Sequence, residues 1–241
     1  MAVEQKAYPH PHVNDAWLAR LREDILEPEL PIIDAHHHMW ERASGVYLLP
    51  QLMADVTAGH NVRGTVYIQC GYGFRADGPA ELKPVGETES VVRITAGSGP
   101  GICAGIIGFT DFRLGERVDA VLEAHVAAGL GRFRGIRQSA GWDPAILTQT
   151  SAPAQPGLLA DPAFRAGIAR LGRFGLSYEA PCIIRNYLNS RPWRVPFPSN
   201  RSWPIIVVVT SRSVRTGRIC TRHSSVGAPA CASSPLARTS I

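Results

Sequence analysis

Strand-like and helix-like patterns alternate along the chain between residues 31 and 180. Runs that are apolar at most positions predict buried strands at residues 31–38, 62–71, 101–110, 132–138 and 176–180. Segments with apolar residues at helical spacing, or with helix-start signals, predict helices at residues 49–59, 87–96, 116–128 and 162–173. Strands of this kind, separated by helices, are typical of a parallel sheet that helices cover.

The number of residues that each strand–helix unit occupies indicates the fold class. Four strand–helix units and a fifth strand occupy residues 31–180, and a barrel of eight such units takes roughly 250 residues. A doubly wound open sheet is the alternative, but it usually carries a glycine-rich turn after its first strand, where this chain has histidines. We therefore expect an α/β fold resembling a (β/α)8 TIM barrel, incomplete and built from about the first four to five β/α units.

The most chemically specific stretch is Asp34-Ala35-His36-His37-His38, at the end of the first predicted strand. Because side chains alternate between faces along a strand, we expect His36 and His38 to point the same way and His37 the other way. Neutral imidazole binds zinc, iron, nickel or manganese, but a catalytic site takes about three or four ligands, so this pair would supply part of one. The alternative is a polar strand end whose histidines make ordinary hydrogen bonds. We expect Asp34, on the face of His36, to orient an imidazole N–H rather than to bind a metal.

The composition changes at the end of the fifth predicted strand. Residues 180–241 hold nine arginines and no lysine, aspartate or glutamate, whereas residues 1–179 carry 16 basic and 20 acidic side chains. The formal net charge of +5 therefore comes from the tail. Its Arg, Ser and Pro content is typical of a disordered basic segment, but Trp193, Trp203 and the apolar run at residues 205–209 are not.

A shift of reading frame near codon 181 is a further explanation of this tail. Back-translation from Cys182 in another frame allows a strand-end histidine followed by an amphipathic helix, as the next barrel unit would require. We therefore divide the chain into an N-terminal arm (1–30), a partial β/α barrel (31–180) and a basic tail with a frameshift as one origin (181–241).

Several other classes of function find little support. No signal peptide is visible, and the apolar run at residues 205–209 is far shorter than the roughly 20 residues of a membrane span, so we expect a cytoplasmic protein with no membrane partner. The five cysteines show no CxxC spacing, which argues against a disulfide scaffold or a zinc ribbon. The tail arginines are scattered without a recognition motif, so we expect no nucleic-acid partner. The sequence sets no oligomeric state.

Three motifs resemble the amidohydrolase superfamily, in particular its amidohydrolase-related branch of metal-dependent TIM-barrel hydrolases. They are Ile32-Ile33-Asp34-Ala35-His36-His37-His38-Met39-Trp40 in the first strand, Phe133-Arg134-Gly135-Ile136-Arg137 in the fourth, and Leu158-Leu159-Ala160-Asp161-Pro162-Ala163-Phe164 before the last helix. The resemblance covers roughly residues 30–180 and looks truncated beyond them.

The resemblance implies a divalent metal ion as cofactor, zinc first, with manganese or iron as alternatives. It matches His36 and His38 to the ligands of the first strand, which in the family are joined by histidines of strands five and six and an aspartate of strand eight. This chain departs from that pattern, because the only histidine after His125 is His223, in the tail. Two imidazoles alone should hold an ion weakly or lose it.

Other polar residues are expected at the same end of the barrel. The resemblance places Arg137 near the mouth, where its planar guanidinium would bind a substrate carboxylate, and an ordinary ion pair is the alternative. Gln69 and Tyr72 close the second strand, and they either line the mouth or hold a loop. Glu87 and Glu89 either orient a ligand or favour a helix N-terminus.

From the resemblance we expect a metal-dependent hydrolase that acts on a small carbonyl substrate, a lactone or a cyclic amide, through a metal-activated water. A decarboxylase of the same branch is one alternative. The other is a catalytically inactive, truncated fragment of such an enzyme.

Overall fold

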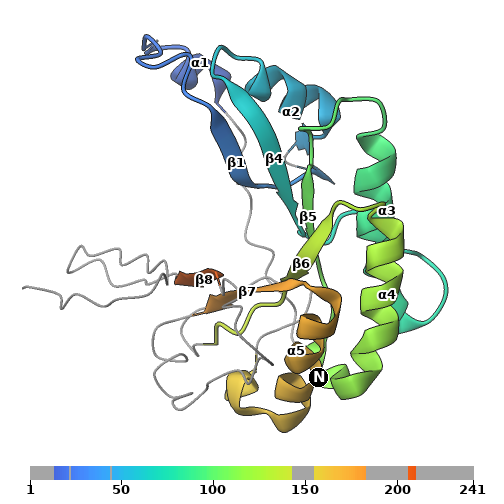
Figure 1. The fold of residues 1–241 in the computed structure, drawn as a ribbon. Helices are drawn as coiled ribbons and strands as arrows, with labels where there is room; N and C mark the ends of the chain where they lie inside the picture. Colours follow the sequence, from blue (N-terminus) through green and yellow to red (C-terminus); the bar gives the residue numbers. More distant parts are fainter. Residues whose placement is uncertain (1–13, 22, 44, 143–154, 183–205, 210–241) are drawn as a thin grey trace, which may run out of the picture.

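A computed structural model describes residues 14–21, 23–43, 45–142, 155–182 and 206–209 (Figure 1). The strands are β1 (Ile32–His37), β2 (Trp40–Arg42), β3 (Gly45–Tyr47), β4 (Val62–Ile68), β5 (Gly105–Gly108), β6 (Phe133–Arg137), β7 (Ser177–Cys182) and β8 (Ile206–Val209). The α-helices are α1 (Asp15–Leu18), α2 (Leu49–Val56), α3 (Val85–Ile94), α4 (Val118–Ala128) and α5 (Pro162–Phe174), and the 3-10 helices are η1 (Ala80–Leu82), η2 (Phe112–Arg117) and η3 (Leu158–Ala160).

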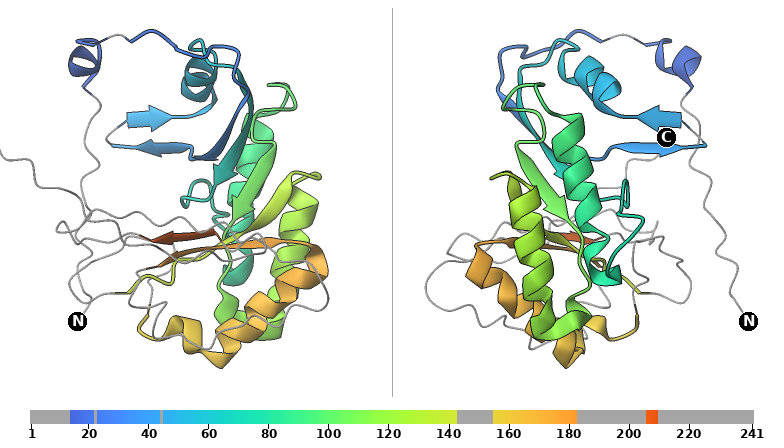
Figure 2. Two further views of the ribbon diagram at one scale, coloured as in Figure 1. Left: turned by 60° about the vertical axis from the view of Figure 1, so that its left-hand side comes forward. Right: turned by 90° about the vertical axis from the view of Figure 1, so that its right-hand side faces the viewer.

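The main sheet has six parallel strands in the order β1-β4-β5-β6-β7-β8, which is also their order along the chain. Helices α3, α4 and α5 lie on one side of this sheet (Figures 1 and 2). A doubly wound sheet would reverse its strand order and carry helices on both faces. The expected α/β fold of an incomplete barrel, with four β/α units and a fifth strand, is therefore confirmed.

The sheet curves around its other face. Arg137 on β6 reaches His36 on β1, with 3.3 Å between Nη1 and Nε2. Two strands, β4 and β5, lie between them, so a flat sheet would separate β1 and β6 by about 14 Å, at about 4.8 Å per strand. The curvature brings the ends of distant strands together, as in a barrel.

The predicted elements of residues 31–180 all form, with ends that differ by a few residues from the expected ones. Helix α5 begins as its sequence indicates: the side chain of Asp161 accepts a hydrogen bond from the backbone N–H of Phe164 at 3.0 Å, and Pro162 is the first helical residue. Within the tail, residues 206–209 form β8, which pairs with β7 in parallel. The rest of the tail lies outside the described residues, as do most of the residues on which the frameshift interpretation depends.

The core lies between the sheet and its helices. Phe112 of η2, Phe164 of α5 and Tyr178 of β7 form a cluster of edge-to-face rings, with centroids 5.4–6.2 Å apart. Gly167 allows α5 to approach η2, because a Cβ at this position would lie 2.2 Å from the carbonyl oxygen of Phe112. These contacts fix β7 and α5 against the rest of the half-barrel.

The described part of the N-terminal arm is exposed. Helix α1 is capped by Asn14, whose side chain accepts a hydrogen bond from the Trp17 N–H at 3.0 Å. Trp17 and Leu18 are more than half exposed, so neither contributes to the core. Among the described residues, no helix has the length and apolar character of a membrane span.

Candidate metal centre

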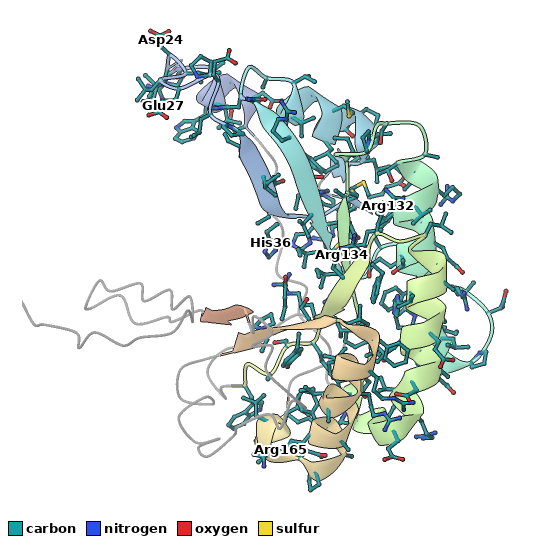
Figure 3. The ribbon with its side chains drawn as sticks, viewed as in Figure 1. Asp24, Glu27, His36, Arg132, Arg134 and Arg165 are labelled. Carbon is teal, nitrogen blue, oxygen red and sulfur yellow. The ribbon has the colours of Figure 1, made fainter. Side chains whose placement is uncertain are left out.

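The candidate residues meet where parallel strands end. His36 and His38 come from the end of β1, Gln69 follows β4, and Arg137 ends β6. Because the carboxyl ends of parallel strands lie along one edge of a sheet, residues far apart in sequence become neighbours there. His36 lies on the side of the sheet away from the helices (Figure 3).

The two imidazoles of His36 and His38 converge, as the strand pattern predicts. Their Nε2 atoms are 3.2 Å apart, and the rings meet edge to face with centroids 4.9 Å apart. His38 Nδ1 lies 2.6 Å from the carbonyl oxygen of Ile68. A carbonyl only accepts, so Nδ1 carries the proton and Nε2 of the neutral ring presents a lone pair.

The environment keeps both rings neutral. Burial lowers the pKa of His38 to about 4, although the hydrogen bond to the Ile68 carbonyl opposes this shift. Burial, with the nearby guanidinium of Arg137, also lowers the pKa of His36. Neutral imidazoles are the form that binds a metal ion.

His37 points to the opposite side, toward the helices. Its Nε2 lies 3.0 Å from the Thr65 hydroxyl and 3.6 Å from the thiol of Cys103. Thr65 also accepts the backbone N–H of Cys103 at 2.8 Å. Burial lowers the pKa of His37. These contacts anchor the middle histidine in the core.

Within the described residues, Asp34 makes no hydrogen bond to an imidazole. Its Oδ1 accepts a hydrogen bond from the backbone N–H of His36 at 3.1 Å. The expected orientation of a ring N–H by this carboxylate is therefore replaced by a bond that shapes the backbone before the histidine pair.

Arg137 lies beside the imidazole pair. Besides its contact with His36, its carbonyl oxygen is 3.5 Å from Nε2 of Gln69, which is buried. The structure thus brings the two predicted substrate-binding residues together. Burial lowers the pKa of Arg137, and the carboxylate of Glu179 opposes that shift.

Glu179 is a site residue that the sequence analysis missed. It pairs in register with Arg137 across β6 and β7, and only 5% of it is exposed. Among the described residues, no hydrogen-bond donor reaches its Oε2 atom. Burial raises its pKa, and Arg137 counteracts the shift. A charged residue amid the otherwise uncharged residues 176–181 was the signal that could have identified it.

The imidazole pair fits two positions around one metal ion. Ligand bonds of about 2.0–2.1 Å from nitrogens 3.2 Å apart would meet at roughly 100–105°, close to a tetrahedral angle. Arg137 only donates, so a hydrogen bond from its Nη1 to His36 requires a lone pair on Nε2 of His36. Two lone pairs at this distance repel unless a cation lies between them. In the described part of the chain, no group of three or more His, Cys, Asp or Glu side chains completes a metal site.

The remaining candidates serve the loop after β4. Glu87 accepts hydrogen bonds from Tyr67 and from the backbone of this loop, including the N–H of Tyr72 at 3.1 Å. Glu89 forms an ion pair with Arg75 at the surface. Of the alternatives for Glu87, a role in holding the loop is the one with direct contacts.

Comparison with known proteins gives partial matches. A curated protein of Sinorhizobium fredii, the uncharacterized protein y4mH, is 27% identical over 173 residues, which cover 63% of this chain and 53% of the relative. The chain therefore spans about half the length of this relative. No family model matches the chain.

Solved structures of amidohydrolases are also similar. An amidohydrolase from Burkholderia multivorans with bound zinc has a TM-score of 0.45 and 19% identity, over 65% of this chain and 51% of its own. A probable 2-pyrone-4,6-dicarboxylic acid hydrolase from Acinetobacter baumannii with bound citric acid has a TM-score of 0.39 and 12% identity, over 65% and 51% of the two chains.

Proposed function

We propose that this chain is a metal-dependent hydrolase of the amidohydrolase superfamily that acts on a small carbonyl substrate, a lactone or a cyclic amide. The observation that carries the proposal is the convergence of the His36 and His38 Nε2 atoms at 3.2 Å, with His38 Nδ1 held by a carbonyl. This donor set and its position at the carboxyl ends of parallel strands are both typical of catalytic sites in barrels.

In this proposal His36 and His38 hold a divalent ion, zinc first. When bound, such an ion lowers the pKa of a water molecule and polarises a carbonyl group. Arg137 offers a planar array of donors for a carboxylate or a carbonyl oxygen of the substrate, and Gln69 adds an amide at the same strand ends. Glu179 balances the charge of Arg137 in a site that is partly shielded from water.

Metal binding provides the first test. Titration of the purified full chain with Zn²⁺ should give one site per chain that weakens at least tenfold in His36→Ala and in His38→Ala, because each variant removes one of two imidazole ligands. His60→Ala is the matched control, because His60 is exposed and outside the site. Equal affinity in all four proteins would contradict the proposal.

Turnover provides the second test. The zinc-loaded chain is incubated with matched pairs of lactones, with and without a carboxylate, and ring opening is followed by proton release. Hydrolysis that favours the carboxylate member, and loses this preference in Arg137→Ala, supports both the reaction and the role of Arg137.

A non-catalytic chain is the second candidate. It is favoured by one observation: the described residues supply two imidazoles and no third ligand to the same ion. Zinc binding without turnover of any lactone or cyclic amide would support this candidate over the hydrolase. Release of CO2 from a carboxylated substrate would instead support a decarboxylase.

A further inference from the structure

A buried carboxylate lies beneath the loop that follows β4. Glu87 is 1% exposed, and its Oε1 atom accepts four hydrogen bonds. The donors are the hydroxyl of Tyr67 at 2.7 Å and the backbone N–H groups of Cys70, Gly71 and Tyr72 at 2.7, 2.9 and 3.1 Å. Three successive N–H groups directed at one oxygen form a concave anion site within the backbone.

This arrangement depends on the carboxylate and on the shape of the loop. Gly71 has a φ of 85°, a conformation that glycine adopts without strain. Without Glu87, these three loop N–H groups would lose their common acceptor, and each one left unsatisfied would destabilise the loop. Burial raises the pKa of Glu87, and the four hydrogen bonds act against this shift.

The last residue of β4 and the loop after it contact the chain at the end of β1 at two points. The carbonyl oxygen of Ile68 lies 2.6 Å from His38 Nδ1, and the thiol of Cys70 donates to the carbonyl oxygen of Met39 at 3.1 Å. The first contact sets the tautomer and the tilt of the His38 ring. The second holds the backbone directly after that histidine.

A simple role at the helix N-terminus does not account for these contacts. Glu87 is the third residue of α3, where a carboxylate is favourable to the helix dipole. However, the four groups that donate to its Oε1 belong to β4 and the following loop, and none of them is a residue of α3. The carboxylate therefore joins the helix to the loop rather than capping the helix.

We propose that Glu87 is a positioning residue, which fixes the loop after β4 so that the Ile68 carbonyl holds the His38 ring with Nε2 directed at His36. The metal-binding consequence rests on the proposed function, but the placement of the ring does not. The effect of Glu87 on the site is thus transmitted through Ile68 and Cys70, without contact between Glu87 and the imidazoles.

The first experiment measures ring placement in the metal-free protein. In Glu87→Gln the neutral amide is a weaker acceptor than the carboxylate, so we expect faster exchange of the loop amides 70–72, by about tenfold, and a shifted or lost NMR signal for the His38 Nδ1 proton. Thr88→Val is the matched control on the same helix. It removes a buried hydrogen bond to His125 Nδ1 (2.8 Å), which leads away from the site, and should leave the His38 signal unchanged.

The second experiment uses Co²⁺ as a spectroscopic probe. We expect Glu87→Gln to weaken Co²⁺ binding on the order of tenfold and to change the visible spectrum, as loss of a group that orients a metal ligand does. Thr88→Val should match wild type in affinity and spectrum even where its melting temperature falls equally.

The NMR and Co²⁺ experiments together distinguish a failure of the positioning role from a failure of the proposed function. An unchanged His38 Nδ1 signal in Glu87→Gln overturns the positioning role, whatever the metal does. A wild-type chain that binds no Co²⁺ contradicts the proposed function, while the NMR arm still decides the role of Glu87. Equal losses in Glu87→Gln and Thr88→Val would reduce that role to general stability and overturn the inference.

Discussion

At the residue scale, the guanidinium of Arg137 would compete with a metal ion for the imidazole of His36. It donates toward the same Nε2 atom of His36 that an ion would use. Its positive charge also lowers the pKa of both His36 and His38, which reports repulsion of any cation at this position. A metal ion and the present orientation of Arg137 therefore exclude each other, and Glu179 on the adjacent strand provides an alternative partner for the arginine.

This competition predicts the sign of one substitution. Arg137→Met removes the charge and keeps much of the side-chain length, so Zn²⁺ affinity measured by calorimetry should rise by roughly tenfold, because a nearby like charge repels a divalent ion. Arg137→Lys retains the charge and should bind zinc no more tightly than wild type. Weaker binding in Arg137→Met would show that the arginine supports the metal rather than opposing it.

Part of this site could be predicted from the sequence. Strand alternation alone was sufficient to place His36 and His38 together and His37 apart, because the period of two is set by the backbone. The partners of Asp34 and Glu87 could not be predicted in this way. A carboxylate bonds to whichever N–H groups the tertiary structure brings near, and those of Glu87 come from a loop 15–17 residues earlier in the chain.

At the scale of elements, the close contact between α5 and η2 depends on one missing side chain. Gly167 is buried, and its position against the backbone of Phe112 leaves no room for a methyl group. A helix interior otherwise favours alanine over glycine by about 1 kcal/mol. Packing and helix propensity therefore act in opposite directions at this residue.

The contact predicts that two opposite substitutions at neighbouring positions of α5 both destabilise the protein. Gly167→Ala should lower the free energy of unfolding by about 1–3 kcal/mol, because the backbone of η2 or α5 must shift. Ala166→Gly, at an exposed neighbour, should also be destabilising, by about 1 kcal/mol through propensity alone. Urea denaturation of both variants checks this. A stabilised Gly167→Ala would mean that the two elements separate at no cost.

At the scale of the whole molecule, the order of strands follows from short crossover connections of one hand. From β1 to β7, each strand of the main sheet pairs with the next main-sheet strand along the chain because a helix returns the chain beside the strand it has left. This rule made the half-barrel predictable from the alternation of elements. It could not predict β8, because a single apolar run in a basic segment carries no signal of the strand it will join.

One buried histidine links the stability of the whole molecule to pH. His125 of α4 lies 3.0 Å from the Phe109 carbonyl oxygen through Nε2, contacts Thr88 of α3 through Nδ1, and stacks on Phe133 of β6. Burial lowers its pKa to about 4, whereas the hydrogen bond to Phe109 opposes the shift. The unfolded chain, with a histidine pKa of about 6.5, therefore binds a proton more readily than the folded one.

The sign of the effect follows from this difference. The free energy of unfolding should be constant with respect to His125 above about pH 6.5 and should fall as the pH drops toward 4, by at most about 1.4 kcal/mol per pH unit. His125→Gln cannot titrate, so its urea midpoint should fall less between pH 7.5 and 5 than that of wild type. Parallel curves for the two proteins would show that His125 is protonated in the fold.

The two contacts that build the candidate site differ in the sequence separation of the residues that they join. The imidazole pair, the carbonyl that orients it and the supporting Glu87 all lie within residues 36–87, and His38 and Ile68 are 30 residues apart. Arg137 joins His36 across 101 residues and through two further strands, β5 and β6. During translation, the nascent chain can therefore present both imidazoles to a cation before the arginine has left the ribosome. Under the proposed function, this order of synthesis would let a metal ion bind the imidazoles before the guanidinium of Arg137 reaches them.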